Sequence, residues 1–283
     1  MQIDTTIQDI RSRVRQWQAA GERVALVPTM GNLHEGHLRL VDRARELADR
    51  VVVSIFVNPI QFGPGEDLDS YPRTESQDAD KLRERGADLL FLPDEAELYP
   101  NGREGLTLVH VPGLTEELCG ASRPGHFDGV TTVVAKLFHI VGPDVAVFGR
   151  KDYQQLAVIR RMVSDLDFPA AIEGAPTVRE ADGLAMSSRN AYLDADQRRR
   201  APRLYETLQA AARQLEQGRE PAGVENDALQ ALEAAGFEPE YVSVRRAHDL
   251  SPAGADDRQL VILAAARLGK ARLIDNLEVE LPG

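Results

Sequence analysis

Two histidines lie three residues apart in a glycine-containing segment, residues 28–37, which reads PTMGNLHEGH. Gly31 and Gly36 let the backbone approach a bulky ligand, and a helix that begins here would offer free N–H groups and the positive end of its dipole to an anion. His34 and His37, at the start of such a helix, could point toward the same ligand. The segment therefore predicts a phosphate-binding loop, although it matches neither the dinucleotide fingerprint nor the P-loop.

Two other interpretations of the histidines stay open. A zinc site of the metalloprotease type needs histidines at i and i+4 on an unbroken helix, whereas here the spacing is three and Gly36 interrupts the segment, so zinc is disfavoured. The histidines could also be ordinary core or surface residues without a chemical task.

A second polar loop, residues 58–65, reads NPIQFGPG and follows an apolar run. The carboxamide of Gln61 can both donate and accept hydrogen bonds, which suits a hydroxyl or carboxylate partner. Asn, Pro and Gly also form ordinary turns, so the segment by itself fits a structural turn equally well.

A third cluster, residues 148–155, reads FGRKDYQQ. A lysine in the first turn of a helix opposes the helix dipole, so Lys151 is better explained by a negatively charged ligand than by solvent. Asp152 could cap the helix or accept a hydrogen bond from a sugar hydroxyl. Gln155, one turn further on, could face the same opening as Gln61.

A fourth cluster, residues 186–189, reads MSSR. Two hydroxyls and a guanidinium can hold a polyphosphate, because arginine donates forked hydrogen bonds to its oxygens. Residues 187–189, Ser-Ser-Arg, are weak evidence for a phosphate site by themselves. Together with the histidine loop and Lys151 they favour a nucleotide site.

Alternating strands and helices must bring these clusters together. Short apolar runs alternate with helical patterns in the first half of the chain, which is typical of a doubly wound parallel sheet. Such sheets bind ligands beyond the carboxyl ends of their strands, which is where all four clusters lie. The predicted strands are residues 23–27, 51–57, 88–92, 145–148 and 176–178, and the predicted helices are residues 40–48, 76–85, 131–141 and 153–166.

After about residue 190 the pattern changes to a small α+β domain. A charged, alanine-rich helical stretch over residues 196–218 and a shorter helix over 224–235 precede three β-like segments, residues 241–244, 260–264 and 271–275. The link lies within residues 178–194. We therefore expect one domain over residues 1–178 and a smaller one over 179–283.

Composition narrows the functional classes. The 283 residues carry 33 Lys and Arg against 45 Asp and Glu, a net charge of −12, which argues against long nucleic acid as a partner. A single cysteine, Cys119, fits a reducing compartment, and we expect a cytoplasmic location. Apolar runs are far shorter than the roughly 18 residues that a membrane span needs, and the first residues do not read as an export signal, so we expect neither feature.

The ordered set of segments resembles the pantothenate synthetase family, which belongs to the nucleotidylyltransferase group related to class I aminoacyl-tRNA synthetases. The similarity is strong from about residue 20 to 190 and less diagnostic in the alanine-rich helices. The segments that carry it are residues 28–37, 57–62, 67–74, 123–127, 151–155, 186–189 and 272–276.

The resemblance implies a reaction and an assembly. The expected reaction is ATP-dependent condensation of pantoate with β-alanine through a pantoyl-adenylate, with release of pyrophosphate and then AMP, and with Mg²⁺. The expected assembly is a homodimer, with a Rossmann-like N-terminal domain that binds ATP and pantoate and a smaller C-terminal lid. We further expect the segment around residues 186–189 to close over the intermediate.

The resemblance also implies roles for individual residues. His34, His37 and Lys151 would be catalytic, with His37 also a proton or hydrogen-bond donor to developing charge; Gln61 and Gln155 would hold pantoate, and Gln61 would also contact β-alanine. Family members carry an acidic metal ligand in the segment matching residues 75–80, where Gln77 and Asp78 compete, so no metal ligand is assigned. The expected ATP-binding residues are Met30, Gly31, Asn32, Leu33, His34, Glu35, Gly36, His37, Gly149, Arg150 (with no role of its own), Lys151, Asp152, Val178, Met186, Ser187, Ser188 and Arg189.

Two rival functions use the same loops. One is a transferase that couples a phosphate-bearing substrate to a nucleotide without forming an amide, and the other is a nucleotide-binding sensor without turnover. A tRNA-dependent synthetase is disfavoured by the acidic balance and by the lack of an appended basic region in the sequence.

Overall fold

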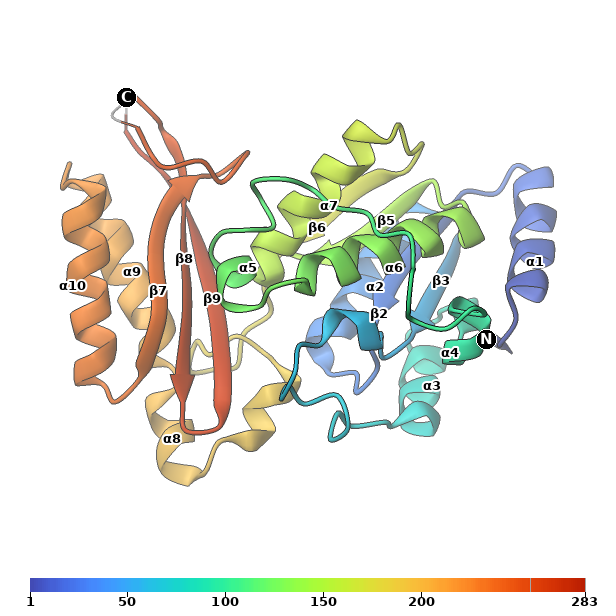
Figure 1. Ribbon diagram of the computed structural model, residues 1–283, viewed down its shortest axis with the longest axis horizontal. Helices are drawn as coiled ribbons and strands as arrows, with labels where there is room; N and C mark the ends of the chain where they lie inside the picture. Colours follow the sequence, from blue (N-terminus) through green and yellow to red (C-terminus); the bar gives the residue numbers. More distant parts are fainter. Residues whose placement is uncertain (255, 283) are drawn as a thin grey trace.

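The computed structural model describes residues 1–254 and 256–282, which contain two β-sheets (Figure 1). The larger sheet has six parallel strands in the order β1-β4-β3-β2-β5-β6, which confirms the predicted doubly wound architecture. The smaller sheet is antiparallel, in the order β7-β8-β9. The strands are β1 (Gln2–Asp4), β2 (Val24–Thr29), β3 (Arg50–Ile55), β4 (Leu89–Phe91), β5 (Val145–Gly149), β6 (Ala171–Ala175), β7 (Glu238–Arg246), β8 (Gln259–Leu268) and β9 (Ala271–Glu280).

Helices cover both faces of the parallel sheet. Alternate residues of β2 point to opposite sides: Val24 and Leu26 pack with α1, α6 and α7, whereas Ala25 and Val27 pack with α2 and α3. Burial on both faces explains why β2 and β3 are continuously apolar. The helices of this part are α1 (Ile7–Ala19), α2 (Glu35–Leu47), α3 (Glu75–Glu84), α4 (Glu95–Leu98), α5 (Cys119–Ser122), α6 (His126–Val141) and α7 (Tyr153–Asp165), with single 3₁₀ turns η1 (Pro59–Gln61) and η2 (Arg150–Asp152).

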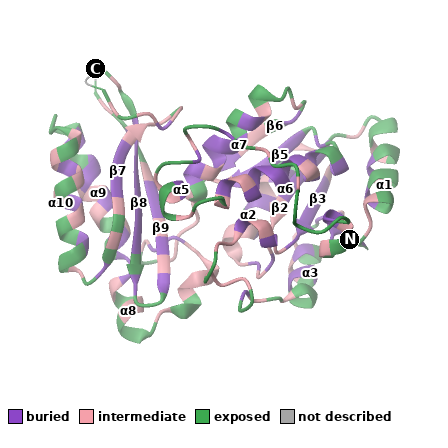
Figure 2. Ribbon diagram, in the orientation of Figure 1, coloured by how far each residue is buried: buried purple, intermediate pink, exposed green. Residues whose placement is uncertain are grey.

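The antiparallel sheet has a core of its own. Side chains of α9 (Arg203–Glu216) and α10 (Pro221–Ala234) pack against β7, β8 and β9, while η3 (Ser188–Tyr192) and α8 (Ala195–Arg200) connect the two sheets. Figure 2 shows the buried residues concentrated in the strands and the exposed ones on the outer helices. A domain boundary at residues 178 and 179 remains a proposal. A smaller apolar cluster joins the two parts, because Tyr153 and Ala157 of α7 pack with Val261 and Leu263 of β8.

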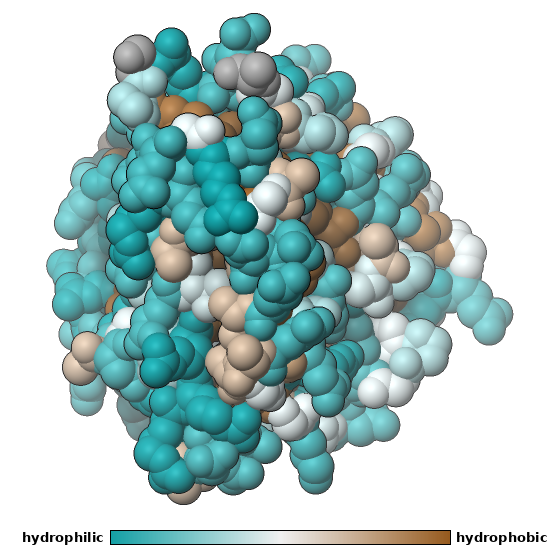
Figure 3. Space-filling view, turned by 90° about the vertical axis from the view of Figure 1, so that its left-hand side faces the viewer, coloured by the Kyte–Doolittle hydropathy of each residue, from teal (hydrophilic) through white to brown (hydrophobic). Residues whose placement is uncertain are grey.

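The face of the molecule on the side of α10 is mostly hydrophilic, with only small apolar patches between charged side chains (Figure 3). Among the described residues, no helix combines the length and the apolar character that crossing a membrane requires.

Three predicted elements differ from the structure. The strand expected at residues 176–178 is β6 (Ala171–Ala175), an edge strand whose Glu173 and Gly174 hide it from an apolar pattern, so residues 176–178 form the loop after it. The helix expected over residues 196–218 is divided into α8 and α9 at Pro202, which lacks the N–H that a helix interior needs. Helix α6 begins at His126, before the predicted residue 131.

Candidate functional site

The two histidines begin helix α2 and cap it reciprocally. His34 Nδ1 accepts a hydrogen bond from the Gly36 N–H at 3.1 Å, and His37 Nδ1 accepts one from the His34 N–H at 3.3 Å. This is a capping box built from imidazoles. Because each Nδ1 is an acceptor, the proton of each neutral ring lies on Nε2.

Both imidazoles are neutral at physiological pH. Burial, helped by nearby positive charge that includes Lys151, lowers the pKa of His34 to about 4 and that of His37 to about 3. The ring centroids are 4.1 Å apart. The pair therefore supplies two uncharged N–H donors, and the roles expected for His37 as a proton donor or a hydrogen-bond donor stay predictions.

A cavity of about 220 Å³ lies at the carboxyl ends of β2, β3, β5 and β6, and we call it the strand-end cavity. It brings together most of the predicted site residues, as the doubly wound sheet requires. Its inner wall is apolar and comes largely from α6. The predicted residues that line it are Met30, His34, Gly36, His37, Gln61, Gly149, Lys151, Asp152, Gln155, Val178 and Met186.

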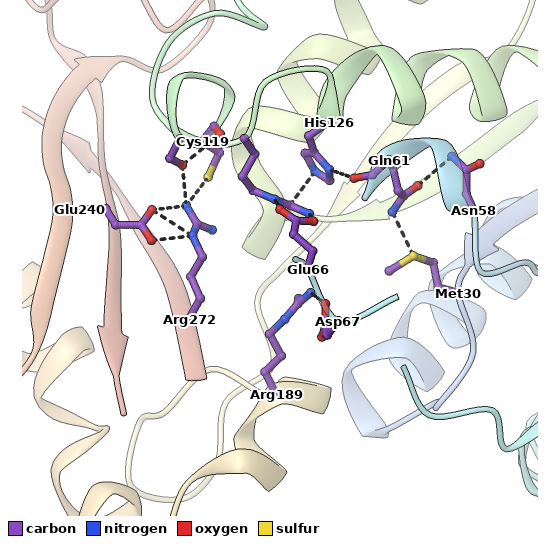
Figure 4. A network of polar contacts seen from close by, with 12 residues as sticks. Met30, Asn58, Gln61, Glu66, Asp67, Cys119, His126, Arg189, Glu240 and Arg272 are labelled. Carbon is purple, nitrogen blue, oxygen red and sulfur yellow. Dashed lines mark hydrogen bonds and ion pairs between the residues drawn. The ribbon is translucent and has the colours of Figure 1, made fainter. Parts of the chain in front are cut away.

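A second cavity, of about 260 Å³, lies between the parallel sheet and the β8–β9 hairpin, and we call it the inter-sheet cavity. Lys151, Asp152 and Gln155 line both cavities, so the two spaces meet at the start of α7. Ser187 and Arg189 line this cavity and not the strand-end cavity, and Arg189 Nη2 lies 3.3 Å from Asp67 Oδ1 (Figure 4). The Ser187 hydroxyl and the Arg189 guanidinium therefore lie on the side of Lys151 that faces the inter-sheet cavity.

Asp78 holds the loop that precedes α2. Its buried carboxylate accepts hydrogen bonds from the N–H groups of Asn32 at 2.7 Å and Leu33 at 2.8 Å, and from the hydroxyl of Thr74 at 3.0 Å. Asn32 and Leu33 are expected to bind ATP, but their N–H groups bond to Asp78. The left-handed Gly31 begins this turn, with φ +83°, so its glycine serves the turn rather than the approach of a ligand.

Three other predicted residues lie beside the cavities and not in the strand-end wall. Glu35 accepts a hydrogen bond from Arg85 at 2.6 Å. Arg150 forms an ion pair with Glu278 of β9 at 2.9 Å. Ser188 is the first residue of η3, between Ser187 and Arg189. The Glu35 and Arg150 side chains thus hold α2 and η2, which carry cavity-lining residues.

Two residues that sequence reasoning did not assign line the inter-sheet cavity and support the strand-end cavity from there. Asn276 of β9 donates from Nδ2 to the carbonyl oxygens of Arg150 at 2.9 Å and Lys151 at 2.8 Å, and so fixes η2. His126 Nδ1 lies 2.8 Å from the carbonyl oxygen of Gln61 (Figure 4). Both belong to segments that carried the family resemblance, which was the available signal.

The fold and the site together define a class of protein. A parallel doubly wound sheet presents N–H donors, a lysine and two glutamines around one cavity at its strand ends, as Rossmann-like enzymes that bind anionic ligands do. In the described residues no group of three or more His, Cys, Asp or Glu is arranged to hold a metal ion.

Comparison with known proteins identifies the family. The family model described as pantoate-beta-alanine ligase matches residues 2–278. The chain is 57% identical over 278 residues to pantothenate synthetase from Pseudomonas aeruginosa, with 98% of each chain covered, and 59% identical over 274 residues to that from Halorhodospira halophila, with 96% covered. The chain belongs to the pantoate-beta-alanine ligase family and is a ligase, which confirms the resemblance seen in its sequence.

Solved structures of the same family have the same fold as this chain. The pantothenate synthetase from Thermus thermophilus superposes with a TM-score of 0.93 at 48% identity over the whole of both chains. The pantoate-beta-alanine ligase from Francisella tularensis, solved in complex with beta-gamma ATP and beta-alanine, superposes with a TM-score of 0.82 at 33% identity, covering 98% of this chain and 97% of that one.

Proposed function

We propose that the protein condenses pantoate with β-alanine to form pantothenate, and that it cleaves ATP to AMP and pyrophosphate through a pantoyl-adenylate. The observation that carries the proposal is the strand-end cavity, where two neutral imidazole N–H donors, the Lys151 cation and the carboxamides of Gln61 and Gln155 line one space. The ligand set of the Francisella tularensis relative supports the choice of ATP and β-alanine.

The first step joins pantoate to the nucleotide. A carboxylate oxygen of pantoate forms a bond to the α-phosphorus, the bond from that phosphorus to the β-phosphate bridging oxygen breaks, and pyrophosphate leaves with the electron pair. His34, His37 and Lys151 stabilise the charge on the phosphoryl oxygens, because donors fixed before the reaction need no reorganisation. Gln61 and Gln155 hold pantoate for in-line attack.

The remaining expected nucleotide contacts divide between the two cavities. Met30, Gly36, Gly149, Asp152, Val178 and Met186 line the strand-end cavity and would surround the nucleoside and the α-phosphate. Ser187 and Arg189 line the inter-sheet cavity, and with Ser188 beside them they would contact the departing pyrophosphate.

The second step forms the amide. The free amine of β-alanine attacks the acyl carbon of the mixed anhydride, the carbon–oxygen bond to phosphate breaks, AMP leaves, and the nitrogen releases one proton to solvent. Because the anhydride is already activated, the step needs no strong base. Gln61 would contact β-alanine as well as pantoate.

Magnesium fits the site as a phosphate-bound ion. Proteins commonly hold Mg²⁺ with one or two carboxylates together with substrate phosphates, and Asp152 is the carboxylate that lines both cavities. When bound, the ion would neutralise phosphate charge. A homodimer and a cytoplasmic location complete the proposal.

Omission of substrates tests the function. Purified protein is mixed with ATP, Mg²⁺, D-pantoate and β-alanine, and AMP and pyrophosphate are measured with each component left out in turn. We expect AMP and pantothenate only in the complete mixture. A dinucleotide-type product with pyrophosphate would indicate the transferase instead, and ATP binding without pyrophosphate release in every mixture would indicate the sensor.

Closure of residues 186–189 over the adenylate is a further part of the proposal. Met186 lines the strand-end cavity, its N–H donates to the carbonyl of Val178 at 2.9 Å, and Gly183 before it has a left-handed φ of +92°. A segment that closes would exclude water from the reactive anhydride. We expect hydrogen exchange over residues 186–189 to slow when adenylate is bound; exchange that stays fast would contradict closure.

A further inference from the structure

A buried chain of hydrogen bonds leads from Tyr99 to the strand-end cavity. The hydroxyl of Tyr99 donates to Asn58 Oδ1 at 2.7 Å, and Asn58 Nδ2 donates to Gln61 Oε1 at 3.1 Å (Figure 4 shows the Asn58–Gln61 bond). Tyr99, Asn58 and Gln61 are 2%, 1% and 8% exposed. Since little water reaches these groups, each hydrogen bond constrains its neighbour strongly.

A backbone carbonyl fixes the direction of this chain. Asn58 Nδ2 also donates to the carbonyl oxygen of Gly129 at 3.0 Å, and a carbonyl can only accept. The nitrogen of Asn58 must therefore face Gly129 and Gln61, and its oxygen must face Tyr99. The atom of Gln61 that meets Asn58 is then its oxygen, so its nitrogen lies on the other side, 2.9 Å from the sulfur of Met30, which lines the cavity.

The backbone of Gln61 is fixed as tightly as its side chain. Helix α6 packs directly on η1 at Gly129, where an added Cβ would lie 2.5 Å from the carbonyl oxygen of Ile60 and 2.6 Å from Gln61 Cα. His126, from the first turn of the same helix, contacts the Gln61 carbonyl. Helix α6 thus holds the backbone of Gln61, while Asn58 holds its carboxamide.

We infer that Tyr99 is a positioning residue which, through Asn58, holds the Gln61 carboxamide with its N–H groups toward the strand-end cavity. The cavity then selects an organic acid that places an acceptor oxygen, from a carboxylate or a hydroxyl group, at this point. The inference rests on the proposed function, because it concerns how pantoate is bound there.

Tyr99 does not line the strand-end cavity itself, and its hydroxyl reaches Gln61 through Asn58. It follows α4, 41 residues from Asn58 in the sequence, and its ring centroid lies 6.0 Å from that of Phe56, a residue of the cavity wall. Burial raises the pKa of its hydroxyl, so the group stays a donor throughout the physiological range. Loss of this donor would leave Asn58 Oδ1 buried without its partner.

Tyr99→Phe tests the inference. Initial rates of AMP formation are measured with D-pantoate varied at saturating ATP and β-alanine, and then with ATP varied. We expect KM for pantoate to rise by about 10-fold, the size of one lost buried hydrogen bond, with kcat changed less and KM for ATP within about twofold of wild type. An unchanged KM for pantoate, or an equal rise for both substrates, would overturn it.

Thr115→Val is the matched control. It also removes a buried hydroxyl, one that donates to the Val111 carbonyl at 2.8 Å, and Thr115 lines neither cavity. We expect a comparable fall in melting temperature with the ratio of the two KM values unchanged. A rise of that ratio in the control as large as in Tyr99→Phe would show a general loss of stability and contradict positioning.

Two further arms keep the result decisive. If Tyr99→Phe does not fold, Asn58→Ser is used instead, because it breaks the same chain of hydrogen bonds at the link next to Gln61. We then expect the same rise in KM for pantoate without a rise for ATP. Absence of that rise would refute the inference. If the wild-type protein forms no AMP in the complete mixture, the proposed function fails, whereas an active wild type with an unaffected variant refutes the positioning role alone.

Discussion

His34 and His37 give the site hydrogen-bond donors without charge. Their low pKa values, about 4 and about 3, follow first from burial and then from nearby positive charge, so both rings are neutral wherever the enzyme is expected to work. In the proposed reaction Lys151 would supply the positive charge toward phosphate instead. The roles would then divide, with the imidazoles orienting the α-phosphate and the lysine offsetting its charge.

Replacement of either kind of donor tests this division. We expect His37→Ala and Lys151→Ala each to slow adenylate formation by about two decades, since the loss of one pre-oriented donor costs on the order of 3 kcal/mol of transition-state stabilisation. Rapid-quench measurement of the adenylate is the readout. His139→Ala, on the exposed side of α6, is the control, and near-normal adenylate formation in either site variant would remove that residue from the mechanism.

The sequence predicted the residues that touch the cavity better than those that support them. The histidine pair, Lys151 and the glutamines stand in short local patterns. Asp78, Asn276 and Tyr99 do not, because each acts on a loop that is 41 to 126 residues away and only the folded chain brings them together. Their roles depend on tertiary contacts that no spacing rule records.

At the scale of the element, the first turn of α2 requires a glycine. An added Cβ at Gly36 would lie 2.8 Å from His34 Cε1 and 2.9 Å from Nδ1. The His34 ring lies over the N–H that it caps, so the space a side chain would need is already filled. The glycine therefore serves the imidazole as well as the cavity it lines.

Gly36→Ala should displace the ring. We expect KM for ATP to rise by about 10-fold and the melting temperature to fall, because a displaced His34 loses its cap, which is worth about 1 kcal/mol. Gly223→Ala is the matched control: it lies near the start of α10, and its Cβ would come no closer than 3.5 Å to the neighbours of that glycine. That variant should keep its KM for ATP; equal effects in both would contradict a specific role for Gly36.

The strands and helices were predicted correctly where burial is uniform along the element. The prediction failed at the edge strands of the sheet and where Pro202 divides a helical stretch. The central strands β2, β3 and β5 were found because burial on both faces demands apolar runs. The short edge strand β1 and the edge strand β6 carry no such run, and β6 was placed several residues too late. The positions of the loops that follow the central strands were nevertheless predicted correctly, because the central strands fix where those loops begin.

At the scale of the whole molecule, acid should weaken the fold. Burial lowers the pKa values of His34, His37 and His126 to about 4, 3 and 4, from 6.5. As the pH falls below 6.5, the unfolded chain therefore binds protons that the folded chain excludes, and the free energy of unfolding decreases until the pH reaches the folded pKa values. Above 6.5 these groups contribute no pH dependence.

Urea denaturation at pH 7.0, 6.0 and 5.0 measures this effect. We expect His126→Asn to reduce the slope of the unfolding free energy between pH 6 and 5 by up to about 1.4 kcal/mol per pH unit, the value for one proton. A slope equal to that of wild type would show that His126 is protonated in the folded chain. His139→Asn serves for comparison.

The two halves of the chain meet through side chains that also hold the site. From β9, Asn276 donates to the carbonyl oxygens of Lys151 and Arg150, and Glu278 accepts a hydrogen bond from the Arg150 guanidinium. The resemblance to the family anticipated a lid, and the division at residue 178 stays a prediction. These contacts mean that the second sheet helps to set the position of Lys151.

The imidazole capping box of α2 links the formation of that helix to the tautomers of the two histidines. The same two bonds that start the helix decide which nitrogen of each ring carries its hydrogen. In the denatured ensemble neither tautomer is enforced, so the reactive arrangement exists only after that first turn has nucleated. If the histidines bind ATP as proposed, fraying there would abolish nucleotide binding while the rest of the protein remained folded.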